Sequence, residues 1–341
     1  MKSIIVKEGV ENIDIEEWSH FVNNHPKGSI FQSYDIYISY TKVRGHCPYV
    51  FSAYHNNRLV GVLLADVIKE GRGLKSFCSR RSIIMSGPIV DDDDSNIIDH
   101  LLKAYDKLVA NKVIYTQVRN QFQQLANCDI FRQNGFLYEP HLNYLIHLDD
   151  EQSIWNRIGK GRIKQIKKAQ NNGLIVDVYR DSQISDELID EGYKVIQEVY
   201  VRAKLPLVDV ELIKSMRNVG RLVVFIVRTN ECKIAGCRFA LSFRDCLYGW
   251  YAGSYGIFYK LFPNDLLIWE TLRWACVNGF RVFDYGGAGS PNKPYGVRLF
   301  KSQMGGELVE YGRYEIVHKP LLMKIAKLGF SILRNISSKR N

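Results

Sequence analysis

The stretch that decides the fold runs from Leu261 to Gly306 and reads LFPNDLLIWETLRWACVNGFRVFDYGGAGSPNKPYGVRLFKSQMGG. Apolar residues recur at helical spacing from Leu266 to Val277, and the pair Asn278-Gly279 after them is typical of a helix end. Asn264 is a favourable N-cap in front of this run, and Asp265 lies where the positive end of a helix dipole favours a carboxylate. The sequence therefore predicts a helix that begins at Asn264 and stops at Asn278-Gly279.

A short strand and a glycine-rich loop follow this helix. The residues from Arg281 to Tyr285 predict a buried strand, and Gly286-Gly287-Ala288-Gly289 predicts a loop at its end. Glycines let a backbone approach a ligand closely, although this spacing matches neither of the common phosphate-binding loops. A tight turn after the strand explains the same four residues equally well. Helix, strand and loop together predict a compact α/β unit that builds a site.

The composition indicates a soluble globular protein of two domains. A chain of 341 residues fits two domains of about 150 residues each, and 46% hydrophobic residues supply a sizeable core. Lys and Arg number 46 against 36 Asp and Glu, which gives a formal net charge of +10. This excess favours anionic partners, namely nucleic acids, phosphorylated metabolites or an acidic membrane surface, without choosing among them.

Neither a metal site nor a membrane span is expected. The seven cysteines contain no C-x-x-C pair, and the eight histidines show no zinc-ligand spacing. The acidic run from Asp91 to Asp94 is interpreted as a helix cap and solvated loop. The N-terminus lacks the apolar run of a secretion signal, and no stretch reaches the roughly 18 apolar residues of a transmembrane helix. These features predict a cytoplasmic protein with reduced thiols.

Strands and helices alternate in both halves of the chain. Residues 1–148 predict one mixed α/β domain, and residues 149–318 predict a second with a similar order of elements but no residue-level repeat. Residues 319–341 place apolar side chains on one stripe of a basic helix. Two interpretations of this terminal helix stay open, namely packing against a domain and peripheral contact with an anionic membrane.

A strongly basic segment opens the second domain. Residues 151–171 predict a single helix, closed by Asn172-Gly173, that carries several Lys and Arg residues and almost no acid. Cations gathered on one surface attract anions, so Arg162 and Lys164 are candidates for binding a substrate phosphate. A solvated basic face without a ligand is the alternative.

Several short motifs occur in a fixed order. They are CKIAGCRF at 232–239, YGWYAGS at 248–254, PNDLLIWE at 263–270, FDYGG at 283–287 and YGVRLFK at 295–301. Together with the basic segment at 162–173, and more weakly SGP at 86–88, this order resembles the GNAT-like acyltransferase domains of the FemABX family. The coiled-coil arm of some family members has no counterpart here.

The resemblance implies two tandem GNAT-like domains with mixed sheets and a cleft between them. It also implies an enzyme, an acyltransferase that acts on an amine. In FemABX proteins the donor is aminoacyl-tRNA and the acceptor is a peptidoglycan precursor, whereas related GNAT-like domains use acyl-CoA, often in polysaccharide pathways. No tightly bound cofactor is expected.

Three functions remain open. The first is an aminoacyltransferase acting on an anionic or lipid-linked cell-wall or surface-glycan precursor, with tRNA as a partner. The second is an acyl-CoA-dependent N-acetyltransferase acting on a nucleotide- or lipid-linked sugar. The third is a catalytically silent binding module for an anionic glycan or nucleic acid. The residues from Tyr259 to Asp265 depart from the pyrophosphate turn of ordinary acetyl-CoA enzymes, which disfavours CoA.

Candidate site residues follow from the matched positions. Lys301 is expected to hold the donor or the oxyanion, Asp284 to orient or deprotonate the amine, and Tyr251 to donate to a carbonyl or relay a proton. Each also has a structural interpretation: a surface lysine, a carboxylate that caps the Gly-Gly turn, and a tyrosine packed in a sheet. No activated nucleophile is evident, so direct attack by the amine is expected. The expected substrate-binding residues are Phe300, Arg298, Tyr295, Asn264, Arg162 and Lys164.

Overall fold

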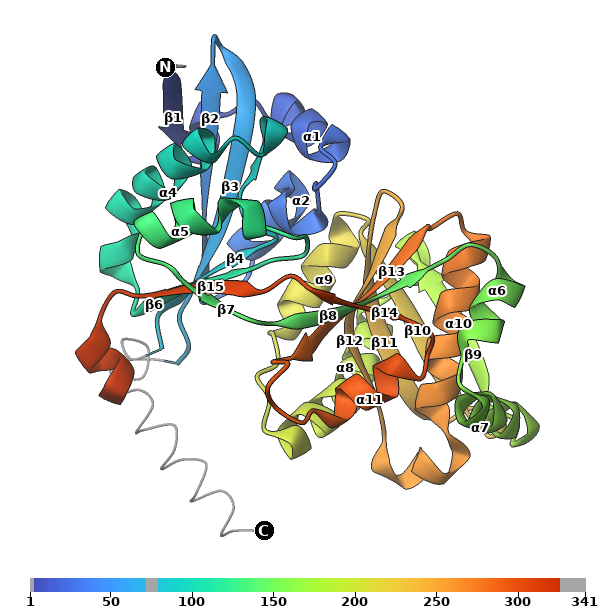
Figure 1. Ribbon diagram of the computed structural model, residues 1–341. Coiled ribbons are helices and arrows are strands. Elements are labelled where there is room, and N and C mark those ends of the chain that lie inside the picture. The colour runs from blue at the N-terminus through green and yellow to red at the C-terminus, as the bar shows by residue number, and fades with distance from the viewer. Residues whose placement is uncertain (1–2, 72–78, 326–341) are drawn as a thin grey trace. The chain divides into compact units, whose positions relative to one another are not determined.

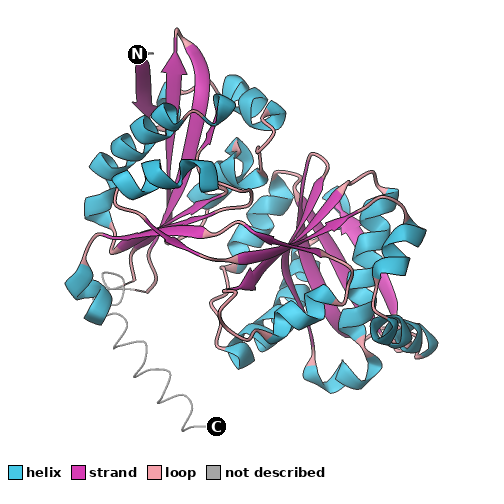
Figure 2. Ribbon diagram, viewed as in Figure 1, coloured by secondary structure: helices cyan, strands magenta, loops and turns pink. Residues whose placement is uncertain are grey.

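Two mixed β-sheets, each with its own helices, organise the chain (Figures 1 and 2). The computed structural model describes residues 3–71 and 79–325. The chain divides into a first unit, Met1–Pro140 with Tyr311–Asn341, and a second unit, His141–Glu310. The predicted mixed α/β class with two tandem units is confirmed.

The first sheet is antiparallel except at its centre. Its order is β1-β2-β3-β4-β6-β15-β7, with β5 paired to β3 off this path, and only β4 and β6 run parallel. The strands are β1 (Ile4–Glu8), β2 (His46–His55), β3 (Arg58–Ile68), β4 (Arg81–Met85), β5 (Ile89–Val90), β6 (Tyr115–Arg119), β7 (Leu137–Glu139) and β15 (Arg313–Val317).

Among the described residues, the helices before β15 in this unit are α1 (Ile15–Asn24), α2 (Tyr34–Thr41), α4 (Ser95–Val109) and α5 (Cys128–Gln133). Asp94 caps α4 by accepting a hydrogen bond from the Asn96 amide at 2.9 Å, as the acidic run predicted. Helix α4 buries Leu101 and Tyr105 against Phe51 of β2, so the core of this unit lies between α4 and the sheet.

The second sheet repeats the same pattern. Its order is β9-β10-β11-β12-β13-β8-β14, and again only one central pair, β12 with β13, is parallel. Its strands are β8 (Leu142–His147), β9 (Ile175–Arg180), β10 (Leu222–Arg228), β11 (Ile234–Phe243), β12 (Cys246–Ser254), β13 (Val282–Gly289) and β14 (Glu307–Glu310). Its helices are α6 (Glu151–Arg157), α7 (Lys160–Asn171), α8 (Asp186–Ala203), α9 (Val210–Asn218), α10 (Pro263–Val277) and α11 (Gly296–Ser302).

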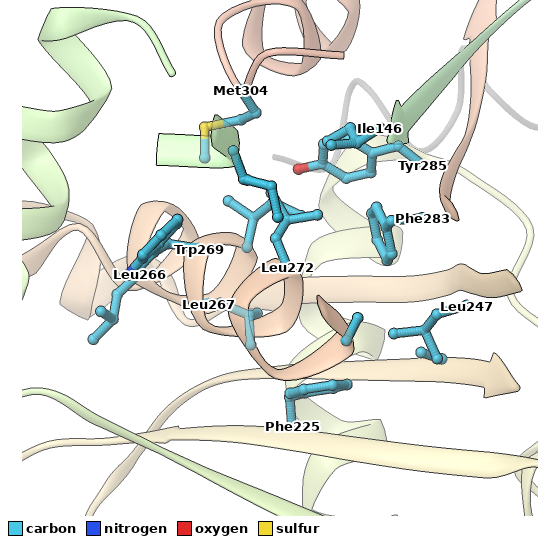
Figure 3. Close-up of a cluster of buried hydrophobic side chains, with 14 of the residues drawn as sticks. Ile146, Phe225, Leu247, Leu266, Leu267, Trp269, Leu272, Phe283, Tyr285 and Met304 are labelled. Carbon is cyan, nitrogen blue, oxygen red and sulfur yellow. The ribbon is translucent and has the colours of Figure 1, made fainter. Parts of the chain in front are cut away.

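Helix α10 covers one face of the second sheet. It buries Leu266, Leu267 and Leu272 in a cluster that also holds Phe225 of β10 and Phe283 of β13 (Figure 3). Side chains alternate between the two faces of a strand, so the opposite face of β11 meets helix α8. There a β-carbon added to Gly192 would lie 2.7 Å from Cys237 Sγ, and this close packing requires glycine.

Two strands, β8 and β15, do not pair with the strands that precede them in the sequence but belong to the other sheet. β8 follows β7 of the first unit but pairs with β13 and β14 in the second sheet, and β15 follows β14 but pairs with β6 and β7 in the first. The unit boundaries at 140/141 and 310/311 therefore differ from the predicted 148/149 and 318/319. Local sequence patterns reveal a strand but not its pairing partner, which explains the difference.

Three local predictions are wrong. Asn264 is not the N-cap of α10: the helix begins at Pro263, whose fixed φ suits the first helical position, and Phe262 precedes it in a left-handed conformation. The glycines of 286–289 belong to strand β13, not to a loop after it. The basic segment forms two helices, because Ile158 and Gly159 adopt extended backbone between α6 and α7.

The predicted C-terminal helix lies largely outside the described residues. Residues 320–325 are helical, and the structure describes nothing after residue 325. In the part of the chain that the structure describes, no helix is long and apolar enough to cross a bilayer.

Candidate functional site

The site is built where the two parallel strands of the second sheet separate. β12 and β13 pair from Cys246↔Val282 to Tyr248↔Asp284 and no further. Beyond that point β13 shifts register against β8, and Gly286 takes a positive φ of 72°. A positive φ favours glycine, so this position explains part of the Gly-Gly pair. Ligands of α/β sheets bind where neighbouring strands separate at their carboxyl ends.

Asp284 lies at this separation with its side chain buried. One carboxylate oxygen accepts a hydrogen bond from the Gly286 amide at 2.7 Å. This is the turn-capping bond that the structural interpretation of Asp284 expected. Burial raises the pKa of the carboxyl to about 6, although the Gly286 amide and the nearby Lys301 charge both lower it.

Lys301 reaches the same place from helix α11. Its ammonium donates to the main-chain carbonyls of Tyr285 and Gly287, the latter at 3.0 Å, and the side chain is only 7% exposed. Burial lowers the pKa of Lys301 to about 8, with Asp284 opposing and Arg238 adding to the decrease. Lys301 is therefore not a surface lysine, and the two expected catalytic residues, Asp284 and Lys301, share one buried region.

Arg238 is a buried cation that the sequence prediction missed. Its guanidinium carbon lies 5.3 Å from the ring centroids of both Phe283 and Tyr285. Burial lowers its pKa, and the charge and hydroxyl of Tyr285 oppose this. A β-carbon at Gly249 would lie 2.9 Å from Arg238 Nη1, so glycine on β12 makes room for the guanidinium. The sequence signal that could have identified Arg238 is a single arginine within the largely apolar strand IAGCRFALSF.

A second polar group joins α7 to α10. Arg162 donates to Asp265 at 3.0 Å and to Gln303 at 2.8 Å, and its guanidinium lies 4.6 Å from the Phe300 ring centroid. Burial raises the pKa of Asp265, and the Arg162 charge opposes the increase. Arg162 is thus bound by protein groups. It contacts Phe300, the residue that precedes Lys301 in the chain.

The other expected binding residues lie at different depths. Arg298 donates to the carbonyls of Ala288 and Lys293, at 2.9 and 3.1 Å, and to that of Ser290, so it closes the loop after β13. Lys164 on α7 is exposed. Asn264 is partly buried in the first turn of α10.

Tyr251 belongs to an aromatic group on β12 and α8. Its ring centroid lies 5.5 Å from that of Tyr200 and 5.1 Å from that of Trp250. Burial raises the pKa of Tyr200 to about 12, with smaller electrostatic effects from Tyr295 and Arg238. Tyr200 therefore lies within electrostatic reach of Tyr295 and Arg238, and Tyr251 contacts Tyr200.

The described residues contain no group of three His, Cys, Asp or Glu side chains that could hold a metal ion. The chemistry available at the site consists of a carboxylate, an ammonium, a guanidinium and phenols. Such groups can orient an amine, move a proton and stabilise an oxyanion.

Comparison with known proteins supports the fold described above. The family described as "Acetyltransferase (GNAT) domain" matches residues 165–295. No curated protein sequence matches the chain. Among solved structures, FemX superimposes with a TM-score of 0.70 at 14% identity, covering 94% of this chain and 100% of that one.

Two further structures give similar superpositions. The C-terminal domain of a putative lysylphosphatidylglycerol synthetase from Agrobacterium fabrum has a TM-score of 0.60 at 14% identity, covering 94% of this chain and 95% of that one. A tandem GNAT protein from the clavulanic acid biosynthesis pathway also has a TM-score of 0.60, at 9% identity, covering 93% and 99%. The chain therefore has the tandem GNAT-like fold that it shares with FemX.

Proposed function

We propose that the second unit is an acyltransferase that moves an aminoacyl group from an ester donor to an amine of a cell-wall or surface-glycan precursor. The observation that carries the proposal is the buried pair of Asp284 and Lys301 where β12 and β13 separate. The fold shared with FemX and with a putative lysylphosphatidylglycerol synthetase supports an aminoacyl donor, which would be aminoacyl-tRNA.

The protonation states suit this reaction near neutral pH. With a pKa of about 8, Lys301 is mostly an ammonium at pH 7, and with a pKa of about 6, Asp284 is mostly a carboxylate. An ammonium has three N–H donors, and Lys301 uses two of them on the Tyr285 and Gly287 carbonyls. The third is left for the oxygen that becomes negative in the transition state.

The proposed step is direct. The amine nitrogen forms a bond to the ester carbonyl carbon while Asp284 accepts a proton from that nitrogen. The carbon–oxygen bond of the ester then breaks, and the leaving ribose oxygen takes up the proton that Asp284 accepted. The products are an amide and the free hydroxyl of the donor, and the chain forms no covalent intermediate.

A second candidate function is acyl transfer from acyl-CoA to an amino sugar. The match to the acetyltransferase domain family and the fold of the tandem GNAT protein favour it. Asp265 opposes it, because this carboxylate occupies the first turn of α10 and is bound to Arg162. A helix N-terminus binds a pyrophosphate through its positive end, and a carboxylate already placed there weakens that attraction.

No tightly bound cofactor forms part of the proposal. The protein would act in the cytoplasm on an anionic or lipid-linked acceptor, and its terminal segment would either pack against a domain or contact an anionic membrane.

The test is a transfer assay with radiolabelled donors. Purified protein is incubated with UDP-muramyl-peptide and either a mixture of labelled aminoacyl-tRNAs or labelled acetyl-CoA. Label in the acceptor from the tRNA mixture, lost in Asp284→Asn and Lys301→Met and retained in the exposed control Lys194→Met, supports the proposal. Transfer from acetyl-CoA alone favours the second candidate. Ligand binding without turnover by either donor would indicate a silent binding module.

A further inference from the structure

The first unit has its own separation of parallel strands. β4 and β6 pair in parallel from Arg81↔Tyr115 to Met85↔Arg119, and the Ser86 amide still donates to the Arg119 carbonyl at 2.9 Å. In sheet order this is the place that β12 and β13 occupy in the second unit. Ser86 and Gly87 then adopt positive φ values of 62° and 54°. A non-glycine residue in this conformation is strained, and such strain clusters at ligand sites.

Three buried polar atoms near this turn have no hydrogen-bond partner among the described residues. They are Ser86 Oγ, Asn120 Oδ1 and Gln124 Oε1, on residues that are 0%, 4% and 3% exposed. Buried polar groups in folded proteins are nearly always paired, because an unpaired one loses its bonds to water without replacement. A bound donor, either a ligand or ordered water, would pair the three atoms.

The orientation of both amides is fixed by their partners. Asn120 Nδ2 donates to the Tyr311 carbonyl at 3.1 Å, and Gln124 Nε2 donates to the Pro88 carbonyl at 3.2 Å. If either amide were flipped, its oxygen would face a carbonyl oxygen and repel it. The two unpaired atoms are therefore acceptors.

The unpaired groups gather around Gly87. A β-carbon built on Gly87 would lie 2.6 Å from Gln124 Nε2, 3.5 Å from Asn120 Oδ1 and 3.4 Å from the Phe122 ring. Only a residue without a side chain allows these groups to approach so closely. Ser86, Gly87, Asn120 and Gln124 are called the Gly87 cluster below.

We propose that the Gly87 cluster is a second binding site, which takes a neutral ligand with several hydroxyl groups, such as a sugar. The ligand must donate, because two of the three unpaired atoms can only accept. Acceptor oxygens repel an anion such as phosphate. The Lys27 ammonium, 5.0 Å from the Phe122 ring centroid, is paired with Asp93, so its charge does not decide between a cation and a neutral ligand. A neutral polyol supplies several donors to the unpaired acceptors, and butylammonium tests the cationic alternative.

Phe122 forms the side of the cluster nearest to solvent. It is partly exposed, whereas Ser86, Gly87 and Gln124 are buried. A ligand would therefore reach Gly87 past the Phe122 ring.

The Gly87 cluster contains no group that titrates near neutral pH. Hydroxyl and amide groups bind and orient but do not accept a proton from an amine, in contrast to Asp284 and Lys301. The cluster is therefore a recognition site without chemistry of its own. The inference does not depend on the proposed transfer reaction, since binding can be measured without turnover.

The experiment is isothermal titration of the full chain with small probes. The neutral probes are methyl N-acetyl-β-glucosaminide and methyl β-glucoside, and the charged ones are butylammonium chloride and inorganic phosphate. Saturable binding of a glycoside is expected, weakened about five- to tenfold by Ser86→Ala, which removes one unpaired oxygen, and by Gln124→Leu. The exposed neighbour Gln123→Leu is the matched control and should bind as the wild type does.

Two readouts keep the test decisive. Ser86→Ala removes a buried, unpaired hydroxyl, so it should fold with an unchanged or higher Tm, and its loss of affinity cannot be attributed to unfolding. The proposal is overturned if neither glycoside binds saturably, if Ser86→Ala and Gln124→Leu both bind like wild type, or if butylammonium or phosphate binds more tightly than both glycosides.

Discussion

The substitution Lys301→Met tests the site most directly, because methionine keeps an unbranched stem while removing the ammonium. In the wild type the ammonium binds the Tyr285 and Gly287 carbonyls and has one donor left for the oxyanion. Loss of a single oxyanion donor lowers kcat by about 10² to 10³, or about 3 to 4 kcal/mol of transition-state stabilisation. We expect a decrease of that size in aminoacyl transfer at pH 7.

The same substitution should change stability much less. Burial of the charged Lys301 lowers its pKa from 10.5 to about 8. At pH 7, where Lys301 is charged, this burial costs the folded state about 3 kcal/mol. Methionine removes that penalty but leaves two carbonyls without a partner, at about 1 to 3 kcal/mol each. The two effects oppose each other, so the Tm should move by only a few degrees.

Urea denaturation as a function of pH distinguishes these contributions. Between pH 8 and 10.5 the unfolded state holds a proton on Lys301 that the folded state has released. The free energy of unfolding of the wild type should therefore rise with pH across this window, relative to Lys301→Met, by up to about 3 kcal/mol. The exposed control Lys194→Met should match the wild type in kcat and in this rise. A kcat for Lys301→Met within threefold of the wild type, or no difference between the two stability curves, would refute the reasoning.

Further substitutions test the surrounding groups. Burial raises the pKa of Asp284 to about 6, so transfer should increase as pH rises through 6, and Asp284→Asn should lose this limb together with about a hundredfold in kcat; an unchanged pH–rate profile would exclude Asp284 as the base. Gly249→Ala places a β-carbon 2.7 Å from Phe283 Cζ and 2.9 Å from Arg238 Nη1, which should lower the free energy of unfolding by about 1 to 3 kcal/mol in urea titrations; Gly161→Ala, with nothing within 4 Å, is the control, and equal effects would contradict the packing argument. Arg162→Met leaves the Asp265 carboxylate buried and unpaired, so we expect a loss of about 3 kcal/mol in the free energy of unfolding at pH 7 that diminishes as the pH is lowered and Asp265 binds a proton; a loss independent of pH would show that the ion pair is unimportant.

Local patterns predicted most of the elements of this fold. The three antiparallel strands β10, β11 and β12 and the helix after them follow from apolar periodicity and turn residues, and both halves contain the mixed sheets expected. Pairing between distant segments was not visible in this way. The placement of β8 and β15 depends on contacts made by residues far apart in sequence, which no local propensity encodes.

The site was predictable in its ionisable pair and not in its surroundings. Asp284 and Lys301 stand in motifs that matched a family pattern, and the structure buries both in one region. The sequence pattern predicted Asp265 only as a favourable charge at a helix end, whereas in the structure it pairs with Arg162 on another helix. Whether a cleft between the two units joins the site to a second substrate stays a prediction.

The placement of β8 and β15 also determines when each unit can fold during synthesis. The central β6 of the first sheet lacks one of its two neighbours, β15, until residues 313–317 have left the ribosome, so the N-terminal unit cannot be completed while the middle of the chain is being synthesised. If the gene were divided between the two apparent halves, each fragment would lack one internal strand and would expose an unpaired sheet edge. Fragments divided at residue 148 should therefore aggregate when each is expressed alone. Co-expression of both fragments should restore soluble protein.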